Sequence, residues 1–174
     1  DTLRYNQFDI RNSRTQMTAS FRSDRMLKDF STIDLEANIG TLDTPSVDMD
    51  SIGIDLAVKQ DSVHYSQQIG SISENARFQM VVNSALSDST VSVSIQDFFL
   101  GNNLYAWTNE IRPSFTYQQN GAVEFHNFSF ENRNEYFRLM GTLSKDRADS
   151  LTYVLRDINL KRISELITGK VDFG

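Results

Sequence analysis

Apolar and polar residues alternate along most of this chain, and the alternation is cleanest around Ile52, Ile54, Leu56 and Val58. Small or charged residues separate these four apolar positions. Successive side chains of a β-strand point to opposite faces, so a period of two indicates a strand with one apolar face. The same pattern recurs from Arg4 to Leu160 and predicts a chain built mainly of β-strands.

Several of these strands change parity in the middle. Val123 and Phe125 are apolar at odd positions, whereas Phe128 and Phe130 are apolar at even ones. One inserted residue in a period-two strand is the pattern of a β-bulge or strand bend. Similar slips fall at Gln96-Asp97 and at Arg156-Asp157, and they predict bends at those two places as well.

The slips also suggest an internal repeat of about sixty residues. The segment I-Q-D-F-F-L at 95–100 matches L-R-D-I-N-L at 155–160, and the pattern of residues 5–19 matches that of residues 125–139. Repeated units of this length are typical of elongated proteins in which each unit packs on its neighbours. Alternation alone also makes any two amphipathic strands look alike, which leaves chance similarity as the alternative.

Outside the strands, the pattern predicts turns and one short helix. Asn12-Ser13-Arg14 is a polar segment that predicts a turn between two strands, and residues 26–30 break the period of two. In residues 161–168, Ile163, Leu166 and Ile167 have helical spacing, and Gly169 follows as a stop signal. Residues 171–174 read as the opening of another strand.

We therefore expect an all-β fold with one short helix. The first architecture is a single long antiparallel sheet that curls along its length, with its apolar face lining an open groove and the bulges setting its curvature. The alternative is a β-sandwich, which would bury the apolar faces of two sheets against each other.

In the curled sheet, one set of alternating residues would line the groove as a continuous apolar track. Its members are Ile52, Ile54, Leu56, Val91, Val93, Ile95, Phe137, Leu139, Leu151, Tyr153 and Leu155.

Composition narrows the functional classes. The 174 residues carry a net charge of -6, which disfavours nucleic acid because phosphate binding needs a clustered basic face. There is no cysteine, which excludes disulfides and thiolate metal sites. The sequence contains no apolar run of about 18 residues and no signal peptide. We read the chain as a single β-repeat fragment of a much longer protein, whose anchoring segment would lie elsewhere.

Three stretches carry a resemblance to a known family. They are L-Y-A-W-T-N-E-I-R-P with N-G-A-V-E-F-H-N-F-S-F-E-N within 104–132, Y-F-R-L-M-G-T-L-S-K-D at 136–146, and L-R-D-I-N-L-K-R-I-S-E-L-I-T-G-K-V-D-F-G at 155–174. In this style of strand and turn, the chain resembles the repetitive C-terminal half of the TamB-like translocation and assembly module family, related to the AsmA-like bridge proteins.

The resemblance implies a curled "β-taco" sheet with an open apolar groove. It implies a periplasmic location, with the full-length protein anchored in the inner membrane outside this fragment and an outer-membrane partner of the Omp85 class. It further implies a role in outer-membrane biogenesis through phospholipid transport between the membranes, assembly of nascent outer-membrane protein strands, or both. Acyl chains would lie in the groove, and no catalytic residue or cofactor is required.

Candidate chemistry elsewhere is sparse. His64 stands alone, and Glu124 and His126 share one strand face without a third ligand, so we expect no metal site. Asp48, Asp50 and Asp55 alternate along a strand, which is typical of a solvated face rather than of a calcium loop. No nucleophile, phosphate-loop or zinc-protease motif is present, which disfavours an enzyme.

The main functional alternative is a carbohydrate-binding or adhesive β-sandwich module. Tyr105, Trp107 and Tyr117 could form an aromatic platform for a sugar ring. The same three residues could instead cap one end of the apolar face, and the sequence favours this second interpretation.

Overall fold

The computed structural model describes residues 2–5, 8–21, 30–44, 47–59, 61–73, 75–144 and 150–168, with side chains described from Ile33 onward. The segment 26–30 (apart from Phe30), the stop signal at Gly169 and the strand-like residues 171–174 lie outside these ranges. The elements are β1 (Thr2–Tyr5), β2 (Phe8–Phe21), β3 (Phe30–Asp43), β4 (Asp48–Lys59), β5 (Ser62–Ile72), β6 (Ala76–Leu86), β7 (Thr90–Gly101), β8 (Ala106–Thr108), β9 (Ser114–Gln118), β10 (Val123–Asn132), β11 (Glu135–Leu143), β12 (Ser150–Arg156) and α1 (Leu160–Thr168).

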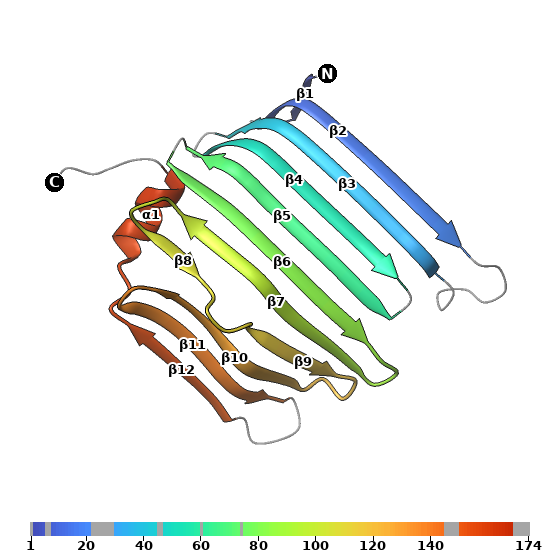
Figure 1. Ribbon diagram of the computed structural model, residues 1–174, viewed down its shortest axis with the longest axis vertical. Helices are drawn as coiled ribbons and strands as arrows, with labels where there is room; N and C mark the ends of the chain where they lie inside the picture. Colours follow the sequence, from blue (N-terminus) through green and yellow to red (C-terminus); the bar gives the residue numbers. More distant parts are fainter. Residues whose placement is uncertain are drawn as a thin grey trace.

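All twelve described strands belong to one antiparallel sheet, and strands that follow each other in the chain are neighbours almost throughout. Figure 1 shows this sheet as a single curled layer with α1 lying at one end of it. The expectation of an all-β curled sheet with one short helix is confirmed. The alternative of a β-sandwich is wrong for the described residues, because no second sheet is present among them to face the first.

β8 and β9 together occupy one position in the sheet. β8 pairs with one end of β7, β9 pairs with the other end, and both also pair with β10. The residues between them leave the sheet and return at Pro113, which is fully buried. The Ile95 backbone N–H donates to the Pro113 carbonyl oxygen at 2.8 Å, so the interruption is tied to β7.

Two of the three parity slips are β-bulges. The register of β10 shifts between Phe125 and Phe128, where Asn127 has a positive φ of 48°. The register of β6 and β7 shifts where Gln96 is inserted. The slip at Arg156-Asp157 is different, because β12 ends at Arg156 and Asp157 begins the turn toward α1 with a φ of 50°.

A further line of irregular pairing crosses β3, β4 and β5. Gly40, Ser51 and Gly70 are skipped in the registers on both sides of β4, and Ser51 has a φ of 55°. Figure 1 shows β3 and β4 arching near this end, where β3 finishes and β4 starts. The strands change parity here, so that Leu42 and Ile72 contact the same apolar cluster as Ile39 and Ile69.

The structure of the N-terminal strands differs from what the sequence pattern predicted. β2 runs without interruption from Phe8 to Phe21, so the turn predicted at Asn12-Ser13-Arg14 is wrong. The proposed correspondence between residues 5–19 and 125–139 also breaks down in this region, since β10 ends at Asn132 whereas β2 continues through Asn12. Likewise, 95–100 is strand, whereas 155–160 leads from the end of β12 into α1.

The buried core lies where α1 packs on the sheet. Leu166 of α1 is buried in one cluster with Ile52, Ile69, Ile72 and Ala76. Two side chains of the β5–β6 turn hold the helix end, since Ser73 Oγ donates to the Ile167 carbonyl at 3.1 Å and Asn75 Nδ2 to the Glu165 carbonyl at 3.2 Å. The helix thus covers only one end of the sheet's apolar face.

Gly141 of β11 is the glycine whose replacement we expect to be most costly. Its φ is 113°, and a Cβ there would overlap the Ser150 carbonyl oxygen. At Gly121, which has a φ of 85°, an added Cβ would meet no other group within 4 Å. We predict that Gly141→Ala destabilises the fold by clearly more than the roughly 1–3 kcal/mol that an unfavourable φ costs alone. Gly121→Ala is the control that carries only this φ cost. Urea unfolding of both variants checks the difference, and equal losses would contradict it.

Candidate functional site: the apolar face of the sheet

The eleven residues predicted to line a groove lie on one face of the sheet, which we call the apolar face. Paired residues of an antiparallel sheet share a face, and the pairings Leu56–Tyr65, Tyr65–Val82 and Val82–Ile95 connect β4 to β7. A second row connects β7 to β12 through Val93, Phe115, Phe125, Gly141 and Leu151. The remaining predicted residues follow by the period of two along each strand.

Exposure along this face changes from one end to the other. Ile52, beneath α1, is only 5% exposed, and Ile95 is also buried. Ile54, Leu56, Val91, Val93, Phe137 and Leu139 are half-buried. On β12 the apolar side chains are open to solvent, with Leu155 60% exposed and Tyr153 68% exposed. The apolar face is therefore closed at the helix end and open along β12.

A strip of phenylalanine rings crosses β7, β10 and β11 on this face. The rings of Phe98 and Phe130 lie 4.6 Å apart, those of Phe128 and Phe130 5.3 Å, and those of Phe125 and Phe128 5.8 Å. Phe137 joins at 6.4 Å from Phe128. These separations suit aromatic packing. Of these five, the sequence-based set included only Phe137, although the parity slips at β7 and β10 place the other four on the same face.

A cavity of about 300 Å³ lies between this phenylalanine strip and α1. We call it the helix-end cavity. Its walls are apolar throughout, and they are contributed by Phe98, Leu100, Trp107, Phe130, Phe137, Ile158, Leu160 and Ile163. A dry apolar cavity of about 150 Å³ can already hold a benzene ring. The helix-end cavity is therefore large enough for several methylene groups and offers no polar partner to water.

A hydrogen-bonded chain holds the loop beside this cavity. Trp107 Nε1 donates to the Tyr105 hydroxyl at 3.1 Å, and that hydroxyl donates to Glu135 at 2.6 Å. The Arg162 guanidinium of α1 lies 5.5 Å from the centre of the Tyr105 ring. Burial, with a further contribution from Glu135, raises the pKa of Tyr105 above its usual value. These two hydrogen bonds and the contact between Arg162 and Tyr105 connect β8, β11 and α1 around the helix end.

The three aromatic residues proposed as a sugar platform do not form one. Trp107 is buried and lines the helix-end cavity, while Tyr105 is engaged in the hydrogen-bonded chain. Tyr117 is exposed on β9, where it pairs with Val91 at the far end of β7. Trp107 and Tyr105 instead cap the helix end of the apolar face, as the second interpretation of the sequence expected, whereas Tyr117 does not.

The opposite face of the sheet is polar, and its side chains bond across neighbouring strands. His64 Nδ1 lies 2.6 Å from Asn83 Oδ1, and Ser66 Oγ donates to Asp55 at 3.2 Å. His126 Nδ1 and Glu124 Oε1 of β10 are 3.8 Å apart, with both side chains partly exposed. Within the described ranges, no three His, Asp or Glu side chains gather as metal ligands.

The carboxylate of Glu131, on the polar face, has a raised pKa. Burial raises the pKa of Glu131, and the neighbouring carboxylate of Glu110 raises it further. Two carboxylates that approach each other favour protonation of one of them.

No helix in the described part of the chain is long and apolar enough to cross a membrane.

These features define a one-layer antiparallel β protein with a helix-capped apolar face. Comparison with protein-family models, with curated proteins and with solved structures finds no match to this chain.

The attachment of α1 can be tested with two leucines of the same helix. Leu166 is 3% exposed in the core cluster, whereas Leu160 is 74% exposed at the rim of the helix-end cavity. We predict that Leu166→Ala costs about 2–5 kcal/mol of unfolding free energy, as for other buried leucines. Leu160→Ala should change it by no more than about 0.5 kcal/mol. Denaturant unfolding measures both, and similar losses would show that α1 is not anchored through Leu166.

The acidity of Tyr105 predicts a pH dependence. Because the pKa of Tyr105 is raised in the folded protein, the unfolded chain loses this proton first as the pH rises above about 10. Stability from this group is therefore complete below about pH 10 and is lost as the pH rises through the folded-state pKa. Unfolding between pH 9 and 11 should show a shallower decline for Tyr105→Phe than for the exposed control Tyr117→Phe. Identical slopes would contradict this assignment.

Proposed function

We propose that the chain is a non-enzymatic module whose apolar face binds acyl chains. One observation carries this proposal. The apolar face extends from β3 to β12, and α1 is the only described element packed on it, at one end. Each methylene group removed from water contributes about 0.8 kcal/mol. An acyl chain lying along the phenylalanine strip would gain this free energy, while its head group stayed in solvent at the open β12 side.

The resemblance to the TamB-like family extends the proposal to a cellular setting. In this setting the chain is a periplasmic part of a longer protein that is anchored in the inner membrane. It contributes to outer-membrane biogenesis with an Omp85-class partner, and its ligand is a phospholipid in transit between the two membranes. The uncovered apolar face and the absence of a second described sheet are the structural features that support this extension.

A second candidate ligand is a nascent outer-membrane protein strand, and one feature of the sheet favours it. Among the described strands, β12 pairs with β11 alone, so its other edge carries backbone groups that can accept an added strand. The exposed side chains of Tyr153 and Leu155 lie beside this edge. Strand addition would use the free edge of β12, whereas acyl binding would use the apolar face next to that edge.

Adjacent residues of β11 provide a test of acyl binding. Leu139 lies on the apolar face opposite Tyr153, whereas its neighbour Met140 points to the polar face. We predict that Leu139→Arg lowers the affinity for a fluorescent fatty acid at least tenfold, because the charge stands in the path of the chain. The matched variant Met140→Arg should bind like the wild type. Fluorescence titration measures the affinity of each protein.

Thermal denaturation of the same variants serves as the control. An unpaired charge in a sealed core costs several kcal/mol, which is comparable to the stability of a domain. On an uncovered face the charge reaches water, so both arginine variants should stay folded. Failure of Leu139→Arg to fold would contradict the open apolar face. Normal binding by a folded Leu139→Arg protein would contradict the acyl-binding function.

A further inference from the structure

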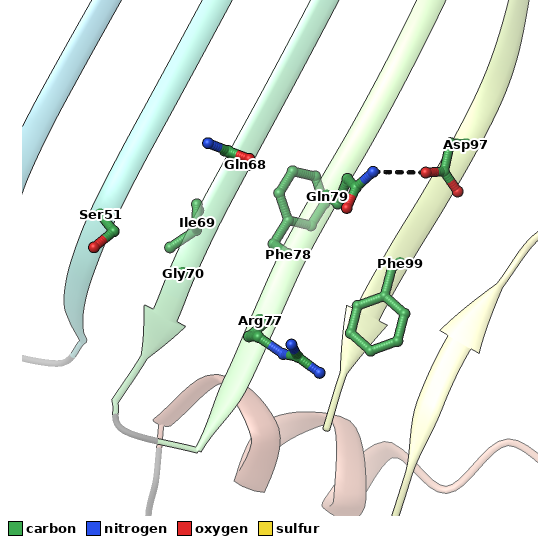
Figure 2. A pocket seen from close by; sticks show the side chains of 9 residues that line it. All are labelled: Ser51, Gln68, Ile69, Gly70, Arg77, Phe78, Gln79, Asp97 and Phe99. Atoms are coloured by element: carbon green, nitrogen blue, oxygen red, sulfur yellow. Dashed lines mark hydrogen bonds between the residues drawn. The ribbon is translucent and has the colours of Figure 1, made fainter. Parts of the chain in front are cut away.

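The polar face contains a hollow of about 510 Å³, on the side of the sheet opposite to the proposed acyl site. Figure 2 shows the residues that line it, which belong to the neighbouring strands β4, β5, β6 and β7. The lining residues are Ser51, Gln68, Ile69, Gly70, Arg77, Phe78, Gln79, Asp97 and Phe99. Of these, Ile69 and Phe78 turn their side chains to the apolar face, where they pack in the core cluster. We call this feature the polar hollow. Its volume falls within the range of about 300–1,000 Å³ that is typical of small-molecule sites.

The hollow is created by the irregular pairing between β4, β5 and β6. Ser51 has a positive φ, and the register between β5 and β6 shifts between Ile69 and Ile72. At Gly70, an added Cβ would lie 2.9 Å from the Ser51 Cβ, so the two strands approach too closely there for a second side chain. A strained residue beside an obligatory glycine therefore leaves the floor of the hollow without large side chains. Such strain is found most often at functional sites.

Two hydrogen bonds engage the polar side chains of the hollow. Gln79 Nε2 donates to Asp97 Oδ2 at 2.7 Å, a bond that Figure 2 also shows. Arg77 Nη2 donates to Asn103 Oδ1 at 3.3 Å, and its guanidinium lies 5.6 Å from the centre of the Phe99 ring. Asp97 has a second carboxylate oxygen, Gln79 a side-chain carbonyl and Arg77 further N–H groups, which supply both acceptors and donors for additional hydrogen bonds.

Phe99 is an exception to the pattern of its strand. It follows Phe98, whose ring belongs to the phenylalanine strip, so Phe99 places an aromatic ring among polar residues on the other face. In the register it stands opposite Gln79, which in turn pairs with Gln68. The side-chain amides of Gln68 and Gln79 therefore lie in one cross-strand row with the aromatic ring of Phe99.

We propose that the polar hollow binds a neutral saccharide. The charges of Arg77 and Asp97 are opposite, so neither an anion nor a cation is favoured by the site as a whole. A sugar ring carries hydroxyl groups that both donate and accept hydrogen bonds, which suits the carboxylate, guanidinium and amides. Its C–H groups suit the ring of Phe99. Polar groups that are already hydrogen-bonded bind with less loss of conformational entropy. This assignment stands independently of the acyl-binding function, because it uses the other face of the sheet.

Ligand-observed NMR can test the assignment with defined probes. Glucose, N-acetylglucosamine, cellobiose and chitobiose are each added to the wild-type chain, and inorganic phosphate and acetate are added as charged competitors. We expect at least one saccharide to bind and neither anion to displace it. Phe99→Ala and Asp97→Ala should each weaken that binding at least fivefold.

Two variants on the same face serve as matched controls. Tyr136→Ala removes an aromatic ring, and Asp55→Ala removes a hydrogen-bonded carboxylate, both outside the hollow. These controls and the groove variant Leu139→Arg should bind the saccharide as the wild type does. Absence of binding by all four saccharides would overturn the proposal. So would displacement by phosphate, or equal losses in Phe99→Ala and Tyr136→Ala.

Discussion

The structure depends on one constraint: in the described part of the chain, a single amphipathic sheet has an apolar face and only one short helix to cover it. Burial of apolar surface contributes about 25 cal/mol per Å², so a ligand that covers exposed apolar area gains free energy of binding. Under α1 this area is used internally, in the cluster around Leu166 and Ile52. Toward β12 the apolar area is not buried within the protein, and Tyr153 and Leu155 remain in contact with solvent. A contiguous apolar patch of this kind is typical of an interaction surface. The acyl-binding proposal follows from this unequal coverage.

Much of the fold could be predicted from the alternation of residues, because alternation is set by which face of a strand meets the apolar layer. The eleven apolar-face residues share one side of the sheet for this reason, and the bulges at Gln96 and Asn127 follow from the change of parity. The same rule failed at Arg156, where the chain leaves the sheet. A parity change records that a strand has lost its register, but it does not distinguish a bulge from a strand end.

Other features depend on neighbours that are distant in sequence. The polar segment Asn12-Ser13-Arg14 has the composition of a turn, yet β2 is paired with β3 along its length, and these ladder bonds override the local preference. The helix-end cavity requires α1 to fold back over Trp107, which lies far earlier in the chain. The polar hollow joins Ser51 to Phe99 through three strand pairings, and no spacing within one strand could reveal it. The only indication of the hollow in the sequence was Phe99, which is an aromatic residue at a position where the alternation predicts a polar one.

The two faces offer different chemistry, and neighbouring residues within a regular stretch of strand lie on opposite faces. The central claim is that the apolar face, and not the polar one, holds acyl chains. Photo-crosslinking with a diazirine fatty acid, followed by peptide mass spectrometry, tests this claim most directly because adjacent residues of one strand report on opposite faces. We expect crosslinks at Phe128, Phe130, Phe137 and Leu139, with Ser129, Arg138 and Met140 unmodified. Crosslinks on both sets of residues, or on the polar set alone, would contradict it.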